Sequence, residues 1–146
     1  VPVMAGGIVL GGTRYSLIPY LRSLQLSWAS SGLPIVRPML LAAPGLASAS
    51  WEQFMLGPDL CVAAITRADQ QLVQVSEAVI ILKLQYVCIQ VSLPSGTWYD
   101  YYSGVSTFSS TEQAKLPVPT KLYQLPVFMR GGSAILMYQG LLEQAQ

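Results

Sequence analysis

Carboxylates are the side chains with the clearest capacity for acid–base or nucleophilic chemistry in this sequence of 146 residues. Two of them could act as nucleophile and proton donor if their carboxyl groups faced each other across a cleft. No pair has a helical or strand spacing that would force this arrangement. We therefore assign a catalytic role to none of the seven, which are Glu52, Asp59, Asp69, Glu77, Asp100, Glu112 and Glu143.

Two of these acids have simpler structural interpretations. Asp59 follows Gly57 and Pro58, so we expect it in a turn, with its carboxylate bonded to nearby backbone amides. Asp100 lies between Tyr99 and Tyr101, and we expect it at an exposed strand or turn position. Both roles are structural.

Histidine is absent from the sequence, and its absence excludes several kinds of site. Ser-His-Asp triads, Cys-His dyads and zinc sites built on His or paired Cys all need residues that the chain lacks. Cys61 and Cys88 are expected to be small buried thiols, with pairing to each other or to another chain as the alternative. We predict no catalytic, substrate-binding, cofactor or metal site in this chain, and the cellular compartment stays open.

The composition predicts apolar surface that needs a partner. Hydrophobic residues make up 52% of the chain and charged residues only 10%, whereas a typical globular protein has roughly 25% charged residues. The net charge of +1 comes without a basic run, which argues against nucleic acid as a partner. The most apolar stretch, residues 75–91, contains Glu77 and Lys83, so no membrane span is expected.

The first element that the pattern predicts is an amphipathic helix within residues 13–31. Its end is well specified, because Gly32 supplies a residue that tolerates positive φ and Pro34 cannot continue the helix. Pro19 fits the first turn of the helix. Apolar residues recur at spacings of mostly three and four, at Leu17, Ile18, Leu21, Leu24 and Trp28.

A short strand, a helical turn and a series of β segments should follow. Residues 33–41 fit a buried parallel strand, and residues 51–56 fit one helical turn capped by Ser50. Residues 57–59 form a turn into a strand at 60–65. Further strand candidates are residues 97–102, 121–123, 127–130 and 134–138.

Residues 75–90 interrupt this plan. The tripeptide Gln-Val-Ser occurs at both ends, at 74–76 and at 90–92, and deleting the stretch would join two halves of one strand. We hypothesise an insertion, such as a retained intron. The alternative is that residues 78–89 form a genuine extra strand or hairpin arm, because they are rich in β-branched residues.

Four groups of residues together resemble glycoside hydrolase family 31, the group of α-glucosidases, sucrase-isomaltase and α-xylosidases. The resemblance covers residues 13–67 and 92–137 approximately, and the first 12 residues and residues 75–90 lie outside it. The matching motifs, in the order of the family, are RYSLIPYL at 14–21, GLPIVRPM at 32–39, QFMLGPDLCVA at 53–63, and LPSGTWYDYYSG at 93–104 with LPVFMRGGS at 125–133.

The resemblance implies a fold and an organisation. Residues 13–56 would be an α/β barrel remnant, the last helix and strand of the catalytic (β/α)8 barrel, and residues 57–140 would be a partial all-β sandwich. The chain begins at Val1 and not at Met, which fits a fragment or a processed chain, and its first residues lack the charged and apolar regions of a secretory signal.

The resemblance also implies a function for the parent enzyme. Retaining hydrolysis of an α-glycosidic bond uses two carboxylates about 5 to 5.5 Å apart, and in this family both lie upstream of the residues present here. We therefore expect the chain alone to be inactive. Its partners would be the remainder of the parent enzyme and the α-glucoside or oligosaccharide substrate of that enzyme.

Arg37 and a group of aromatic residues are the remaining candidates for substrate contact. Arg37 could reach a substrate hydroxyl at the open face of the barrel, but structural pairing is the preferred interpretation. Core or interdomain packing is likewise preferred for the aromatic group, Trp98, Tyr99, Tyr101 and Tyr102. If these aromatics face solvent, the alternative function is a non-catalytic carbohydrate-binding or interaction module.

Overall fold

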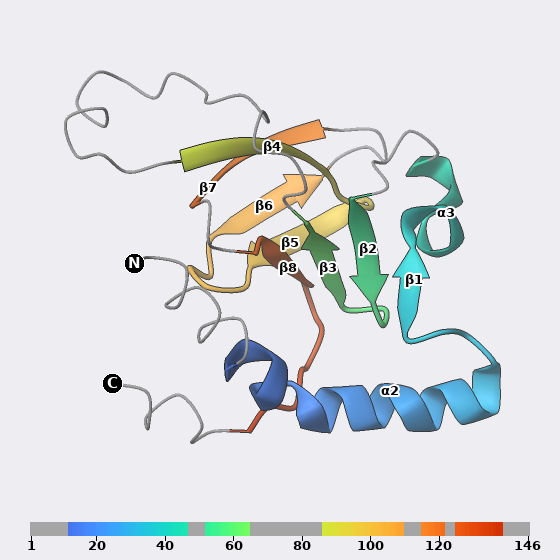
Figure 1. Ribbon diagram of the computed structural model, residues 1–146. Coiled ribbons are helices and arrows are strands. Elements are labelled where there is room, and N and C mark those ends of the chain that lie inside the picture. Colours follow the sequence, from blue (N-terminus) through green and yellow to red (C-terminus); the bar gives the residue numbers. More distant parts are fainter. Residues whose placement is uncertain (1–11, 47–51, 65–85, 110–114, 122–124, 139–146) are drawn as a thin grey trace, which may run out of the picture.

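The computed structural model describes residues 12–46, 52–64, 86–109, 115–121 and 125–138. Their main feature is a six-stranded sheet in the order β1-β2-β3-β8-β5-β6, in which all neighbours are antiparallel (Figure 1). Strands β4 and β7 form a second, two-stranded antiparallel sheet. The elements are α2 (Ile18–Ser31), β1 (Val36–Pro38), α3 (Met39–Ala42), η1 (Pro44–Leu46), β2 (Gln53–Leu56), β3 (Leu60–Ala63), β4 (Tyr86–Ser92), β5 (Gly96–Asp100), β6 (Ser106–Ser109), β7 (Lys115–Lys121) and β8 (Val127–Arg130).

Helix α2 forms where its sequence predicts it. Pro19 lies in its first turn, where a missing backbone N–H breaks no helical hydrogen bond. Gly32 ends the helix with φ 71°, and its N–H donates to the carbonyl of Trp28 at 2.8 Å. The predicted apolar face is confirmed at Leu17 and Leu24, which are buried. Trp28 belongs to the same face but lies half exposed at the far end of the helix.

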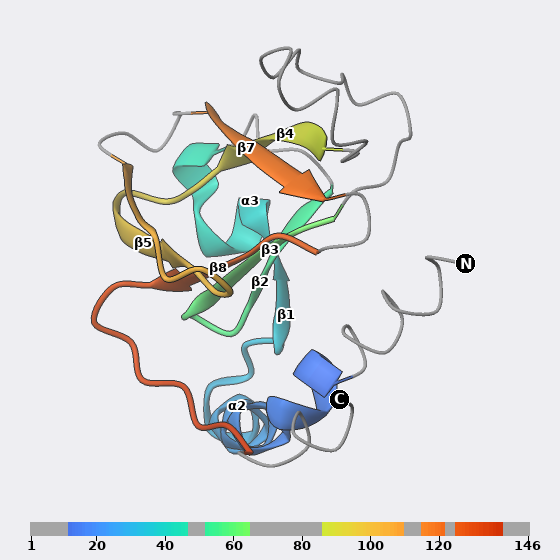
Figure 2. The same ribbon diagram turned by 90° about the vertical axis from the view of Figure 1, so that its left-hand side faces the viewer.

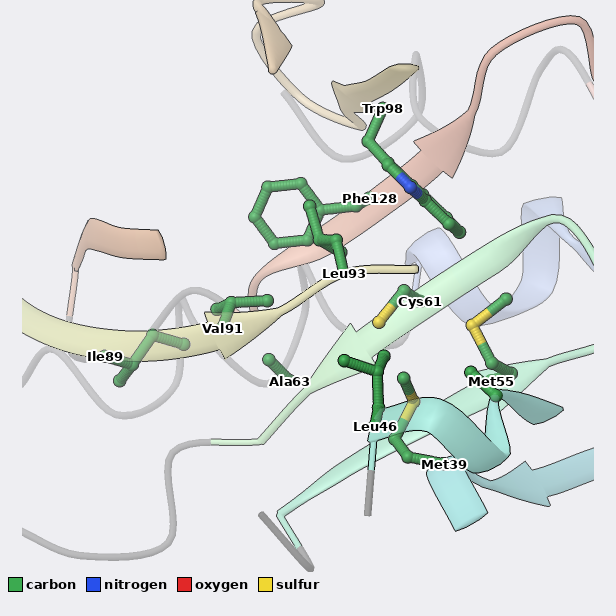
Figure 3. Packing of buried hydrophobic residues seen from close by; sticks show 11 residues of the cluster. Met39, Leu46, Met55, Cys61, Ala63, Ile89, Val91, Leu93, Trp98 and Phe128 are labelled. Atoms are coloured by element: carbon green, nitrogen blue, oxygen red, sulfur yellow. The ribbon is translucent and has the colours of Figure 1, made fainter. Parts of the chain in front are cut away.

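The large sheet buries both of its faces, because residues along each strand alternate between two cores. On one face, α2 packs over residues from β3 and β8; the buried members of this cluster are Leu17, Tyr20, Leu24, Leu60, Val62 and Val127. Figure 2 shows α2 on this side and the β4–β7 pair on the other. The second core is formed by Met39, Ala43, Leu46, Met55, Cys61, Ala63, Ile89, Val91, Leu93, Trp98 and Phe128 (Figure 3).

Two predictions for the segment before β3 are wrong. Of residues 33–41, only Val36–Pro38 forms a strand, and it pairs antiparallel with β2 and is not enclosed. Its position at the sheet edge explains why Pro38, which lacks an N–H, is tolerated there. Residues 53–56 form strand β2 in place of the predicted helical turn, because the alternation of buried Gln53 and Met55 with less buried neighbours has the period of a strand.

The remaining β predictions have mixed outcomes. Strands β3, β5 and β8 confirm the predicted segments near residues 60–65, 97–102 and 127–130, whereas residues 134–138 form no strand. Residues 86–90 of the suspected insertion belong to β4, which pairs with β7 in register from Tyr86↔Lys121 to Ser92↔Lys115. Residues 75–85 lie outside the described part of the chain, so the insertion hypothesis stays a prediction.

The described chain is therefore an antiparallel β structure with few helices. The two sheets pack face to face, since Ile89 and Val91 from β4 share a core with Cys61 and Trp98 of the large sheet. Helix α2 covers the opposite face. A parallel barrel strand does not occur among the described residues.

Candidate functional site

Asp59 lies in the turn between β2 and β3, as its sequence context predicts. Among the described residues, however, its carboxylate accepts hydrogen bonds from two distant side chains and not from nearby backbone amides. Tyr20 on α2 donates its hydroxyl to Oδ2 at 3.2 Å, and Ser133 donates its hydroxyl to Oδ1 at 2.8 Å. The backbone carbonyl of Asp59 accepts the N–H of Arg130 at 2.8 Å. Asp59 therefore connects α2, the turn, and the segment that follows β8.

Tyr20 is the member of this group that approaches from the helix. It is buried, and its hydroxyl also lies 2.9 Å from the carbonyl oxygen of Leu56. Burial, followed by the negative charge of Asp59, raises the pKa of the Tyr20 phenol. The phenol is therefore a neutral hydrogen-bond donor at physiological pH.

Gly57 makes this approach possible. Its φ is +66°, and a Cβ added to it would lie 2.5 Å from the Tyr20 hydroxyl and 2.5 Å from Leu24 Cδ2. Its N–H donates to the carbonyl of Ile35 at 2.8 Å. We call the group formed by Tyr20, Leu56, Gly57, Asp59 and Ser133 the α2 joint.

Asp100 confirms its predicted turn role. Its Oδ1 accepts the N–H of Tyr102 at 3.1 Å, and both the N–H and the hydroxyl of Ser103 at 2.7 Å. These contacts close the turn between β5 and β6. Asp59 and Asp100 thus both serve the fold through hydrogen bonds.

Of the other five acids, only Glu52 lies in the described part of the chain. Glu52 is half-buried, and its backbone carbonyl accepts the N–H of Ala64 at 2.7 Å. Asp69, Glu77, Glu112 and Glu143 lie outside the described residues. The absence of a catalytic pair stays a prediction from the sequence.

Arg37 has a partner close to it in the chain. Its Nε donates to the carbonyl of Pro34 at 2.9 Å, which is the kind of structural pairing that the sequence favours. The strand that carries Arg37 lies at the edge of the sheet and is not the enclosed strand that the sequence predicted. A guanidinium at this edge stays in contact with water and needs no full set of protein acceptors.

The aromatic residues of 98–102 do not share one surface. Trp98 is fully buried in the core between the sheets (Figure 3). Its indole N–H donates to the carbonyl of Pro94 at 2.8 Å. Tyr101 and Tyr102 pack edge to face, with ring centroids 5.2 Å apart, against the core beneath α2. Tyr99 is 36% exposed on the strand face opposite Trp98. Packing is therefore confirmed for Trp98, and the four rings cannot form a single stacking platform.

Sequence reasoning missed Gln53, a polar residue in the core between the sheets. Its side-chain Nε2 donates to the carbonyl of Ser92 at 3.2 Å, and its Oε1 accepts the N–H of Ser92 at 3.1 Å. The Gln53 side-chain amide thus bonds both the N–H and the C=O of Ser92 in β4, as the backbone of a neighbouring strand would. An amide at an inward position of an otherwise apolar strand is the signal that could have revealed it.

Cys61 is a free buried thiol, as expected. Burial raises its pKa from 9.0 to about 12, and the hydrogen bond with Gln53 offsets this only in part. A thiol in this state is a poor nucleophile and a poor metal ligand, because both roles need the thiolate. Nothing is described of the Cys88 side chain.

Several large apolar side chains are exposed along one edge of the molecule. They follow the C-terminal end of α2, the loop to β1, β1 itself and α3, which lie along the right-hand side in Figure 1. Exposed apolar patches are common at surfaces that contact a partner. We call it the edge surface, and it consists of Trp28 (51% exposed), Leu33 (44%), Val36 (53%), Leu40 (67%) and Leu41 (49%).

Other kinds of site find no support in the described residues. They contain no group of three or more Cys, Asp or Glu side chains that could hold a metal ion. None of the helices in the same ranges combines the length and apolar character that crossing a membrane requires.

A family model and the sequence relatives of this chain point to the same protein family. The family model described as the glycosyl hydrolase family 31 C-terminal domain matches residues 32–135. Neutral alpha-glucosidase C of Mus musculus is 30% identical over 131 residues, covering 84% of this chain and 12% of the mouse protein. A human protein named probable maltase-glucoamylase 2 is 29% identical over 123 residues, which cover 82% of this chain and 4% of that protein.

Solved structures agree with the sequence relatives. The family 31 dextranase of Flavobacterium johnsoniae, complexed with glucose, has a TM-score of 0.65 at 30% identity, over 84% of this chain and 13% of the dextranase chain. The cycloalternan-forming enzyme of Listeria monocytogenes has a TM-score of 0.68 at 28% identity, over 86% and 10% of the two chains. The chain therefore spans between 4% and 13% of the length of these four proteins.

Proposed function

The chain belongs to glycoside hydrolase family 31, and from this premise we propose that it is the non-catalytic C-terminal part of a retaining α-glycoside hydrolase. The observation that carries the proposal is the match of residues 32–135 to the C-terminal domain of the family. The small share of each relative that the chain spans supports it as well. The bond-cleaving carboxylates would then belong to another part of the parent enzyme.

The substrate of the parent would be an α-linked glucoside. Relatives that share about 30% identity with this chain are named α-glucosidases, and a structural neighbour is a dextranase complexed with glucose. The chain's own contribution would be to pack against the catalytic part of the enzyme. It supplies no sugar-stacking surface through Trp98, whose burial argues against the alternative of a carbohydrate-binding module.

Helix α2 would be the last element of the catalytic barrel. The predicted division after residue 56 stays a prediction, and two observations favour an earlier one. Strands β1 and β2 pair into the same sheet as β3, and the family model begins at residue 32, directly after α2. We propose that the barrel ends with α2 and that the β domain begins near residue 32.

The edge surface would face the rest of the parent enzyme. It spans the proposed boundary, because Trp28 belongs to α2 whereas Val36 and Leu40 belong to β1 and α3. Burying side chains of this size at an interface contributes about 25 cal/mol per Å² of apolar area removed from water. Few charged residues would have to be desolvated, since only 10% of the chain is charged.

An activity assay tests the proposal directly. The purified chain should not hydrolyse p-nitrophenyl α-glucoside, whereas a full-length family member assayed in parallel should. Turnover that copurifies with the chain and disappears when its gene is omitted from the expression host would refute the proposal.

A further inference from the structure

Three of the segments on which the family resemblance rests, 14–21, 53–63 and 125–133, contribute residues to the α2 joint, and a fourth, 32–39, contacts it. Tyr20 comes from the helix motif at 14–21 and Gly57 and Asp59 from the motif at 53–63. Ser133 ends the motif at 125–133, and Ile35, which accepts the N–H of Gly57, belongs to the motif at 32–39. Segments more than 100 residues apart in the chain, at Tyr20 and Ser133, therefore share the carboxylate of Asp59.

We infer that Asp59 is a positioning residue that locks α2 onto the β domain in one orientation, so that the part of the enzyme preceding residue 32 is held in a fixed pose. The identity of that preceding part rests on the proposed function. The lock itself concerns contacts within this chain and can be tested without any activity.

The apolar contacts beneath α2 do not fix its orientation by themselves. Leu17 and Leu24 bury against Leu60, Val62 and Val127, but contacts of this kind are not directional and tolerate small rotations and shifts of a helix. Hydrogen bonds depend strongly on distance and angle. The single proton of the Tyr20 hydroxyl is shared between Leu56 O at 2.9 Å and Asp59 Oδ2 at 3.2 Å, and this pair of acceptors sets where the helix lies along and around its axis.

The charge of Asp59 strengthens the hydrogen bonds that its carboxylate accepts from Tyr20 and Ser133. Hydrogen bonds to an ionised acceptor are roughly twice as strong as those between neutral groups. Both carboxylate oxygens are used, one for α2 and one for Ser133. Gly57 allows the helix to approach closely enough, since any side chain there would collide with Tyr20 and Leu24.

The segment that Ser133 begins also reaches the residues just before α2. Residues 133–138, which we call the strap, run from the end of β8 to the helix (Figures 1 and 2). At its far end the N–H of Tyr138 donates to the carbonyl of Ser16 at 2.8 Å. Asp59 thus anchors both the helix and the start of the strap that crosses to it.

Hydrogen exchange of the purified chain tests this inference. In Asp59→Ala, the amides of residues 21–28 in α2 should lose about tenfold to a hundredfold in protection, as expected for a lost bond to a charged acceptor. Amides of β3 and β8, such as those of Val62 and Phe128, should change by less than about threefold. Asp59→Asn keeps an oxygen acceptor and should restore part of the protection of α2.

Matched variants separate the lock from a general loss of stability. Tyr20→Phe removes the donor but keeps the ring, and should reproduce the selective loss in α2, whereas Tyr15→Phe alters a tyrosine that is 58% exposed and should have no effect. The inference is overturned if Asp59→Ala leaves the exchange of α2 unchanged. Equal loss of protection in α2, β3 and β8 would also overturn it, because Asp59 would then support the whole fold and not the helix. Neither result depends on whether the chain hydrolyses glucosides.

Discussion

Among the described glycines, Gly57 leaves the least room for an added Cβ. We expect Gly57→Ala to lower the free energy of unfolding by about 3 kcal/mol. About 1 to 2 kcal/mol of this comes from a left-handed backbone that carries a Cβ, and the rest comes from displacement of Tyr20 and Leu24. Urea denaturation followed by circular dichroism measures the change.

A second glycine provides the control for this prediction. Gly104 has a similar φ of +70°, but nothing lies within 4 Å of the position of an added Cβ. Gly104→Ala should therefore lower the free energy of unfolding by only about 1 to 2 kcal/mol, which is the backbone contribution alone. Equal losses in the two variants would show that close contact with α2 plays no part at Gly57.

Cys61 gives a pH-dependent prediction. The pKa of its thiol is 9.0 when the side chain is exposed in the unfolded chain, and burial in the fold raises this pKa to about 12. Between these values the folded state holds the proton more tightly, so the contribution of this thiol is fully present below the lower pKa and is lost as the pH rises through the upper one. Burial raises the pKa of Tyr20 and Tyr102 in the same direction.

A comparison of variants isolates the thiol. In a Cys88→Ala background, the free energy of unfolding should fall more steeply above about pH 9 with Cys61 present than in Cys61→Ala. A thiol reagent should leave Cys61 unmodified at about pH 8 until urea unfolds the chain. Rapid modification of the native protein would contradict the burial of this side chain.

At the scale of elements, α2 depends on a small number of buried contacts with the sheet. Leu24→Ala should lower the free energy of unfolding by about 2 to 4 kcal/mol, because Leu24 is only 6% exposed and its removal leaves a cavity. Leu26→Ala, in the same helix at 75% exposure, should change it by less than about 0.5 kcal/mol. Urea denaturation of both variants measures the difference, and similar values would mean that α2 is not docked on the sheet through Leu24.

Elements with a local signal could be predicted from the sequence. The end of α2 is specified by Gly32, which adopts the positive φ that this residue type tolerates. The turn into β3 follows from Gly57, Pro58 and Asp59. Strand β2 could not be assigned correctly, because only the pairing with β1 and β3 gives Gln53 and Met55 their buried positions.

The prediction of a buried parallel strand at residues 33–41 was wrong for a related reason. Its run of apolar residues suggested an enclosed parallel strand, but apolar side chains at an edge look the same in a sequence as those in a core. The composition had predicted exposed apolar surface, and the edge surface confirms it. Which residues form that surface depends on the sheet order, which brings β1 to the edge.

At the scale of the whole molecule, tertiary contacts determine what each candidate residue does. Asp59 was correctly expected in a turn, yet its partners Tyr20 and Ser133 come from the two ends of the described chain. Gln53 was missed because Ser92, its partner, lies in the other sheet. Contacts between segments that are far apart in the chain produce no local sequence pattern, so they could not be predicted from the sequence.

The edge surface should make the isolated chain bind apolar dyes. Replacing Leu40 and Leu41 together by Ser should reduce the fluorescence of a bound hydrophobic dye by about half or more, because Leu40 is the most exposed side chain of the patch and the adjacent Leu41 is 49% exposed. Replacing Val105 and Leu136 together by Ser removes apolar side chains that are 63% and 65% exposed outside the edge surface, and should have a smaller effect. Circular dichroism checks that both double variants stay folded. If the two double variants reduce dye binding equally, apolar surface is spread over the whole molecule. The edge surface would then be no better a candidate than other faces for the interface with the rest of the enzyme.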